Sequence, residues 1–289
     1  MVTQEDIDFY EKNGYAVIKD FLSPEEVLAL KDEVQKLIAA HIDNPDDLIQ
    51  PSDFGNQKWA TCVYETKLHL EPGSMVDGKL VLPQDEAVQK IGLGLQFDET
   101  AVATKETIYS DKMKTLVREM THQENPKVIQ IMYLLKQPRI GAPRAPHQDE
   151  SYLQTDPPGH LFGVWIALDD ATEENGCLDF VPGSHKTIPV TRLFTKLPEP
   201  EGDLVFKYTG DADYMKDDSK YEYVRCPVKS GDLVLIHGLV LHKSEPNMST
   251  ASRWAWAFHA WDEREGVTFP KAQQVDEPER LPSLYESQP

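Results

Sequence analysis

One imidazole and one carboxylate stand two residues apart at His147 and Asp149, in the segment Ala145-Pro146-His147-Gln148-Asp149. In a β-strand, side chains two residues apart point to the same face, so the pair predicts two neighbouring metal ligands. Two histidines and one carboxylate on one face of an octahedral iron leave the opposite face open for a cosubstrate and oxygen. We take His242 as the expected second histidine. The hypothesis is a mononuclear iron site.

The His-x-Asp pair is not specific by itself. With 9 His and 25 Asp in 289 residues, about one such triplet is expected by chance, and a second one is present at His41-Ile42-Asp43. That triplet lies at the end of a predicted helix, where residues i and i+2 do not face each other. Apolar segments of strand length flank His147, which favours it. His237 competes with His242 as the second histidine, and its alternative role is that of a turn residue.

Arg253 favours His242, because it follows 11 residues later (253 − 242), on the next expected strand. In the segment 253–259, alternation places Arg253, Ala255, Ala257 and His259 on one face and three aromatic residues on the other. An arginine followed by two alanines leaves room above the sheet beside a permanent cation, whose planar fork can bind a carboxylate bidentately. The pattern predicts a small dicarboxylate that chelates the iron and is anchored at its far end by Arg253. Ser244 is a further hydroxyl donor.

Composition narrows the class of protein. A net charge of −20 argues against nucleic-acid binding and against docking on anionic membranes, because both need clustered Lys and Arg. No apolar run reaches the ~18 residues of a membrane span. We expect a cytoplasmic protein, since neither a signal peptide nor a C-terminal peroxisomal signal is recognisable and the 3 cysteines show no metal-ligand spacing. The expected partner is a small-molecule substrate; the sequence does not indicate an oligomeric state.

Local patterns predict helices in the first half of the chain and strands in the second. Helices are expected at residues 3–12, 23–41 and 111–120, with loops and short strands over 43–89. Strands are expected at 15–19, 127–136, 162–168, 177–181, 231–236 and 253–261. Short strands separated by Gly and Pro turns indicate antiparallel sheets closed into a barrel or jelly roll.

The chain is expected to be one domain, residues 1–289, mainly β with flanking helices. In this division residues 1–125 form a helical and loop-rich support, and residues 126–265 form the β core. The polar segment 186–223 is an insertion into that core with little periodicity. A connection longer than ~15 residues is uncommon in a compact domain, so we expect either a lid over the site or a solvated loop.

Seven segments together resemble the phytanoyl-CoA dioxygenase family of iron- and 2-oxoglutarate-dependent oxygenases. They are residues 9–22, 130–137, 146–149, 163–170, 174–178, 182–185 and 237–244, the last of them followed by Arg253. The resemblance covers most of the chain and implies a double-stranded β-helix, or jelly-roll, core.

The resemblance also implies roles for individual residues. Iron(II) would be bound by His147, Asp149 and His242, with no catalytic residue beyond these ligands. The cosubstrate 2-oxoglutarate would be held by Arg253 and Ser244, in a pocket that Trp165, Met132 and Lys90 help to form. This chain departs from the pattern after that lysine, where relatives carry histidines and it has Leu93-Gly94-Leu95-Gln96.

The implied reaction uses O2 and 2-oxoglutarate to hydroxylate an unactivated C–H bond of a small organic or acyl substrate, with release of succinate and CO2. Ascorbate is a candidate reductant. Related halogenases have a small residue in place of the carboxylate ligand, so Asp149 favours hydroxylation. One alternative, a cupin-like metalloprotein, would need a His-x-His pair, and this chain has none. Another is a binding or regulatory protein that keeps the cofactor sites with little turnover.

Overall fold

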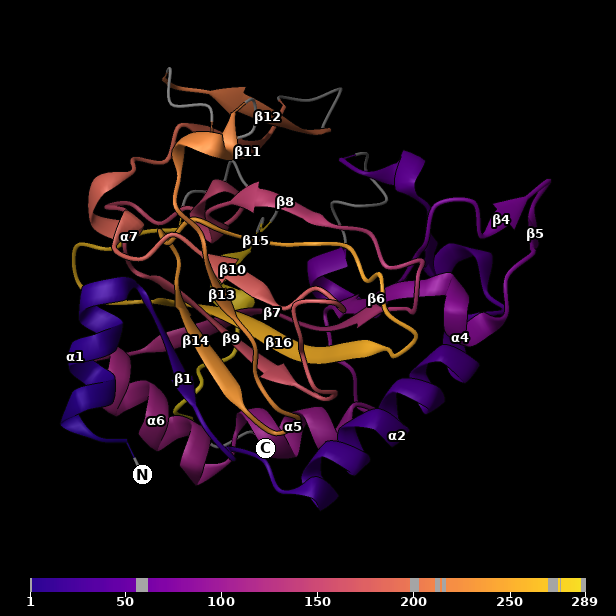
Figure 1. The fold of residues 1–289 in the computed structure, drawn as a ribbon, viewed down its shortest axis with the longest axis horizontal. Coiled ribbons are helices and arrows are strands. Elements are labelled where there is room, and N and C mark those ends of the chain that lie inside the picture. Colours follow the sequence, from indigo (N-terminus) through magenta and orange to yellow (C-terminus); the bar gives the residue numbers. More distant parts are fainter. Residues whose placement is uncertain are drawn as a thin grey trace.

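The computed structural model describes residues 2–55, 62–197, 203–210, 214, 217–269, 275 and 277–286. Within them, a large and a small sheet face each other, and helices cover the outer face of the large one (Figure 1). This is the expected jelly-roll architecture. Of the two alternatives, a barrel or a jelly roll, the described strands exclude the closed barrel, because they form separate sheets.

The large sheet has eight strands, in the order β1-β14-β9-β16-β7-β6-β3-β2. Their bounds are Tyr15–Ile18 (β1), Leu233–His237 (β14), Leu161–Ala167 (β9), Arg253–Asp262 (β16), Pro126–Lys136 (β7), Val88–Leu93 (β6), Leu68–Leu70 (β3) and Leu48–Ile49 (β2). The central strand β16 pairs antiparallel with β7 on one side and β9 on the other. This places the ends of distant segments next to one another.

The small sheet has four strands, in the order β13-β10-β15-β8. They are Val224–Cys226 (β13), Leu178–Phe180 (β10), His242–Ser244 (β15) and Arg144–His147 (β8). β8 and β15 are too short to show a periodicity of their own, and a strand at His147 was expected only from the His-x-Asp pair. A two-stranded β4–β5 pair, Met75–Val76 and Lys79–Leu80, lies apart from both sheets.

Capping explains the main helices. Thr3 and Ser23 each form a reciprocal capping box, so α1 runs over Gln4–Asn13 and α2 over Pro24–His41, as predicted. Ser110 caps α6, Asp111–Thr121. The sequence gives no such signal for α5, Val102–Ile108, because its N-cap is Ala101. Two short helices, α4 (Gln84–Ala87) and α7 (Ser184–Thr187), complete the set that the structure describes.

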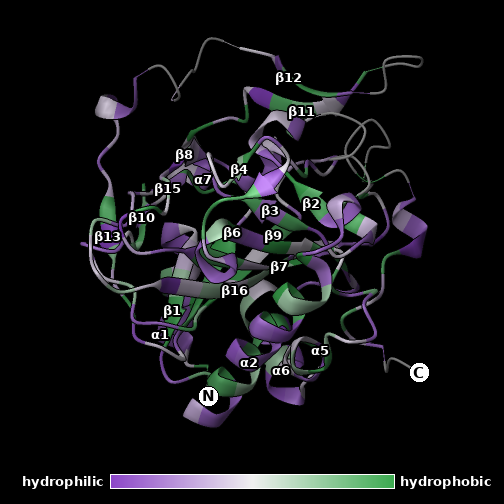
Figure 2. Ribbon diagram, turned by 90° about the vertical axis from the view of Figure 1, so that its right-hand side faces the viewer, coloured by the Kyte–Doolittle hydropathy of each residue, from purple (hydrophilic) through white to green (hydrophobic). Residues whose placement is uncertain are grey.

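The two faces of β16 have different surroundings: one packs in the core and the other borders a cavity. Trp254, Trp256 and Phe258 belong to the core cluster that also contains residues of α2, α5 and α6, as their alternation predicted. Figure 2 shows these three helices on one side of the large sheet. The opposite face, with Arg253 and His259, borders a cavity between the sheets. The helices therefore support one side of a sheet whose other side is available for binding.

The insertion 186–223 is not structureless where it is described. Arg192–Lys196 (β11) and Leu204–Tyr208 (β12) form an antiparallel hairpin, with Phe194 opposite Phe206 and their ring centroids 4.8 Å apart. Alternation over five residues in each arm is too short to have stood out. The hairpin lies beyond β8, at the top of the view in Figure 1. Residues 198–202, 211–213 and 215–216 of the insertion lie outside the described residues.

Candidate metal centre and cosubstrate cavity

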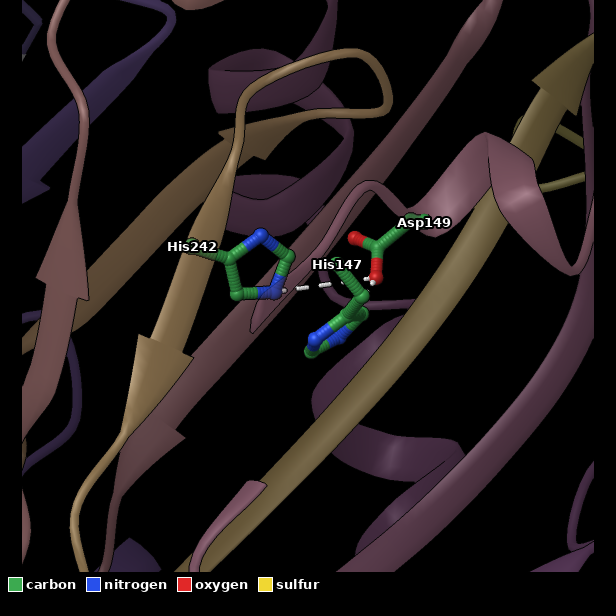
Figure 3. A group of neighbouring side chains, drawn as sticks. All are labelled: His147, Asp149 and His242. Atoms are coloured by element: carbon green, nitrogen blue, oxygen red, sulfur yellow. Dashed lines mark ion pairs between the residues drawn. The ribbon is translucent and has the colours of Figure 1, made fainter. Parts of the chain in front are cut away.

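The structure brings His147, Asp149 and His242 together (Figure 3). His147 ends β8 and His242 begins β15, and the two are direct partners across this antiparallel pair. The Nε2 atoms of His147 and His242 lie 3.5 and 3.7 Å from Oδ1 of Asp149. One donor atom from each of the three residues lies within 4.8 Å of the others. Bonds of ~2.1 Å to a shared ion would place neighbouring donors ~3 Å apart, so a small adjustment would complete the site.

Both histidines are oriented by the backbone. Nδ1 of His147 lies 2.8 Å from the carbonyl oxygen of Ala145, and Nδ1 of His242 lies 3.1 Å from that of Val240. A carbonyl can only accept, so each ring donates from Nδ1, and in its neutral form it presents the Nε2 lone pair. Burial lowers the pKa of His242 to about 4, and His147 beside it acts in the same direction. The arrangement fits a divalent metal ion.

Asp149 is positioned differently from the prediction. β8 ends at His147, and Asp149 opens a 3-10 turn, Asp149–Ser151, so the pair does not share one strand. The extended backbone of Gln148 still places both side chains on one side. Its own amide points the other way and donates to the carbonyl oxygens of Leu239 and Ile188, at 2.7 and 3.0 Å. The middle residue of the triplet therefore anchors the ligand segment to the loop before β15.

His259 completes the surroundings of Asp149, and the sequence analysis assigned it no role. Its Nε2 lies 3.2 Å from Oδ2 of Asp149, whereas the ion pairs with His147 and His242 involve Oδ1. The amide of Gln130 on β7 lies 3.0 Å from Nδ1 of the same ring. Burial alone would raise the pKa of Asp149, but His259 and His242 hold it well below its ordinary value. The only signal in the sequence was that His259 shares a face with Arg253.

The cavity beside the triad has a volume of about 450 Å³ and is bordered by Arg253, Ser244, Trp165, Met132 and Lys90. All five residues implied by the resemblance thus line one space with the triad. Arg253 is 3% exposed, its guanidinium lies 5.4 Å from the Trp165 ring centroid, and its Nε has no hydrogen-bond partner. A buried, unpartnered guanidinium nitrogen at the end of a cavity fits an anionic ligand.

The register of the large sheet explains which residues reach the cavity. Arg253 pairs with Lys136, Ala257 with Met132 and with Trp165, and Lys90 with Leu134. Directly opposed residues share a face, so these side chains all lie on the inward face of β6, β7, β9 and β16, in rows at different positions along the strands. Burial and the nearby Arg144 lower the pKa of Lys90 to about 7. Lys136, on this face and against Ser244, is a second residue that the sequence analysis missed.

The competing histidines lie elsewhere. His237 accepts a hydrogen bond from the backbone N–H of Leu239 and lies against His185 and Tyr10, which fits the turn role. His41 pairs with Asp47 at the end of α2. Among the residues that the structure describes, His147, Asp149 and His242 are the one group placed to hold a metal. No helix in the same part of the chain is long and apolar enough to cross a membrane.

Solved structures share this fold. The carbocyclase SnoK of nogalamycin biosynthesis, described as non-heme and α-ketoglutarate-dependent, matches with a TM-score of 0.67 at 21% identity, over 98% of this chain and 92% of its own. EctD from S. alaskensis, solved with 2-oxoglutarate and 5-hydroxyectoine, matches with a TM-score of 0.64 at 15% identity, over 96% and 81% of the two chains. The fold is that of iron- and 2-oxoglutarate-dependent oxygenases.

Sequence relatives extend along nearly the whole chain. The phytanoyl-CoA dioxygenase domain-containing protein 1 homolog of Caenorhabditis elegans is 35% identical, over 96% of this chain and 97% of its own. Phytanoyl-CoA dioxygenase domain-containing protein 1 of Danio rerio is 35% identical, over 99% of both chains. The family model described as "Phytanoyl-CoA dioxygenase (PhyH)" matches residues 10–255. The chain therefore belongs to the phytanoyl-CoA dioxygenase family.

Proposed function

We propose that the protein is an Fe(II)- and 2-oxoglutarate-dependent dioxygenase that hydroxylates a C–H bond of a small organic or acyl substrate and releases succinate and CO2. The observation that carries the proposal is the convergence of two separate features on one cavity. These are the His147–Asp149–His242 group and the buried Arg253 on β16. A metal site alone would fit many activities, whereas a metal site together with an arginine that can bind a carboxylate fits 2-oxoglutarate.

In this proposal His147, His242 and Oδ1 of Asp149 hold the iron from one side. Bound there, the iron would activate O2 while the oxidative decarboxylation of 2-oxoglutarate supplies electrons. Because β8 and β15 form one side of the site, substrate has to approach from the cavity. The apolar side chains of Met132, Leu134 and Trp165 border that space and would help to exclude water.

Arg253, with Ser244, is proposed to orient the cosubstrate by binding its distal carboxylate. The proposal extends to Lys90, whose side chain borders the same cavity from β6. Asp149 favours hydroxylation over halogenation, because a carboxylate ligand occupies the position that a halide would need. We also propose that residues 1–289 form one oxygenase domain, in which residues 1–125 support the β core.

The test is formation of succinate by protein reconstituted with Fe(II), 2-oxoglutarate and O2. Asp149→Ala should abolish it while the thermal unfolding midpoint stays close to that of the wild type. Arg253→Ala should raise the 2-oxoglutarate concentration needed for half-maximal succinate formation ~10- to 100-fold, the range for a lost charged hydrogen bond. Wild-type protein that binds both ligands without releasing succinate would instead support the binding or regulatory role.

A further inference from the structure

Lys136 is a buried lysine that lines the cavity beside Arg253 and Ser244, the residues proposed to bind the cosubstrate. It is the last residue of β7, is 5% exposed and is the direct strand partner of Arg253. Its Nζ donates to Oγ of Ser244 at 2.9 Å and to the backbone oxygen of Glu245. Two residues proposed to hold the cosubstrate therefore flank it on two sides.

The two hydrogen-bond acceptors of Lys136, the Ser244 hydroxyl and the Glu245 backbone carbonyl, are neutral. A buried ammonium group needs an anion beside it. No carboxylate oxygen of the described residues lies within 4.0 Å of its Nζ, and the carboxylate of Glu245 pairs with Lys243 at 3.2 Å. Buried charges that lack an opposite charge are costly, and a lysine in this position normally gives up its proton. An anion bound beside Lys136 would therefore favour its protonated form.

Titratable groups around the cavity act on the pKa of Lys136 in both directions. Burial lowers the pKa of Lys136 to about 6, and Arg253 and Arg144 act in the same direction. Opposing them are Glu245 and Cys177, together with Glu71, which borders the cavity. At pH 8 most of the lysine is consequently neutral in the ligand-free protein.

The surrounding backbone leaves room for this side chain. A Cβ at Gly141 would lie 2.2 Å from Cγ of Lys136, and one at Gly176 would lie 3.0 Å from its Nζ. Gly176 also has a φ of +82°, which side-chain-bearing residues rarely adopt. The lysine is held at the cavity wall from two sides.

We propose that Lys136 is the second cation of the cosubstrate anchor, that it binds the distal carboxylate together with Arg253, and that it takes up one proton when that carboxylate binds. The inference rests on the proposed function. It adds a residue, Lys136, and the uptake of one proton, neither of which the proposed function requires. Pairing with a carboxylate returns the lysine toward its ordinary pKa of ~10.4, and the proton comes from solvent.

The sign of the pH effect follows. Below about pH 6 the lysine is protonated before and after binding, so pH has no effect through this group. Above that value binding requires proton uptake, and through Lys136 the affinity for 2-oxoglutarate falls by up to ~10-fold per pH unit. A purely structural lysine, tying β7 to β15 in both states, would not make 2-oxoglutarate affinity depend on pH.

The experiment is calorimetric titration of Mn(II)-loaded protein with 2-oxoglutarate at pH 8, in buffers of different ionisation enthalpy. Lys136→Met should lower the affinity ~10- to 100-fold and reduce proton uptake by about one proton relative to the wild type. Lys127→Met is the matched control, because Lys127 lies on the same strand β7 but pairs with Glu263 at 3.4 Å. This control should retain wild-type affinity and wild-type proton uptake.

Equal affinity and equal proton uptake in Lys136→Met and the wild type would overturn the inference, and so would a wild type that takes up no proton. If Lys136→Met does not fold, Lys136→Gln is measured in the same way with the same expected losses. Failure of the proposed function is distinguishable: in that case the wild type does not bind 2-oxoglutarate, or Arg253→Ala binds it as well as the wild type does. Loss of binding in Arg253→Ala with an unchanged Lys136→Met contradicts the inference alone.

Discussion

Asp149 uses its two carboxylate oxygens in different directions. Oδ1 faces His147 and His242, and Oδ2 faces Nε2 of His259 at 3.2 Å. Because His259 is itself contacted by Gln130, we expect the contacts Gln130–His259–Asp149 to orient the carboxylate so that Oδ1 is the oxygen available to a metal. We therefore expect the proposed metal site to depend on His259 of β16, which is not one of the three proposed ligands.

Replacing His259 with Leu should weaken Fe(II) binding ~10- to 100-fold, the usual effect of losing a group that orients a metal ligand. His259→Gln can still donate a hydrogen bond and should recover part of the affinity. Competition with a chelator measures both variants against the wild type. Unchanged affinity in His259→Leu would show that Asp149 is oriented without it.

For single residues, the sequence indicated which side chains share the cavity face but not which contacts they make there. Alternation along residues 253–259 correctly placed Arg253 and His259 on the cavity face, because a strand of ten residues has a regular pleat. It could not show that His259 meets Asp149 or that Lys136 lies against Ser244. Those contacts depend on strand register, and register is set by pairing across the sheet.

Among the elements, α5 shows how one helix can be capped by another. Its N-cap, Ala101, has no side chain that could accept a hydrogen bond. The carboxylate of Glu33 on α2 instead accepts from the backbone N–H groups of Ala103 and Thr104, at 2.6 and 3.2 Å, and from the hydroxyl of Tyr133 at 2.7 Å. α2, α5 and β7 are joined at this point, beneath the cavity floor.

Glu33→Ala should lower the free energy of unfolding by ~1.5 to 3 kcal/mol, because three donors around a buried carboxylate lose their acceptor. Asp32→Ala, at an exposed position on the same helix, should stay within ~0.5 kcal/mol of the wild type. Urea unfolding of the three proteins gives the comparison. Equal stability of Glu33→Ala and Asp32→Ala would refute the cross-cap.

The β11–β12 hairpin is the element whose role stays a proposal. Phe194 and Phe206 pack on Tyr152, with ring centroids 5.7 and 5.2 Å apart, and Tyr152 lies edge-on to His147 at 5.9 Å. A two-stranded pair has few neighbours to stabilise it, so opening without global unfolding is expected. We retain the lid as the proposed role of segment 186–223.

Hydrogen–deuterium exchange should therefore show amides of β11 and β12 exchanging ~100-fold or more faster than those in the centre of β16. Phe206→Ala should accelerate exchange in the hairpin while leaving β16 unchanged. If the hairpin exchanges as slowly as β16, it is part of the rigid core and does not open as a lid.

In the whole molecule, charge is distributed unevenly. The chain has a net charge of −20, yet Lys90, Lys136, Arg144 and Arg253 all border one cavity. An acidic surface around a cavity rich in basic side chains favours a small anionic ligand inside the protein over a polyanion outside it. Composition predicted the surface, but the cluster comes from four strands and has no sequence pattern.

The jelly-roll architecture could be predicted from strand-length segments and their turns, together with the family resemblance. Periodicity could not show β8 and β15, because three or four residues carry none, and a strand at His147 was expected only from the His-x-Asp pair. The pairing of these two strands is nevertheless what joins His147 to His242. The position of Asp149 in a turn could not be predicted either, because a His-x-Asp triplet has the same sequence whether it lies within a strand or at its end.

The most direct test of the metal centre is equilibrium dialysis against Fe(II) without oxygen, followed by metal analysis. We predict one iron per chain in the wild type, loss of that iron in His147→Ala and Asp149→Ala, and full retention in the control His237→Gln, which alters the competing histidine. Wild-type iron content in Asp149→Ala, or its loss in His237→Gln alone, would contradict the assignment of His147, Asp149 and His242 as the metal ligands.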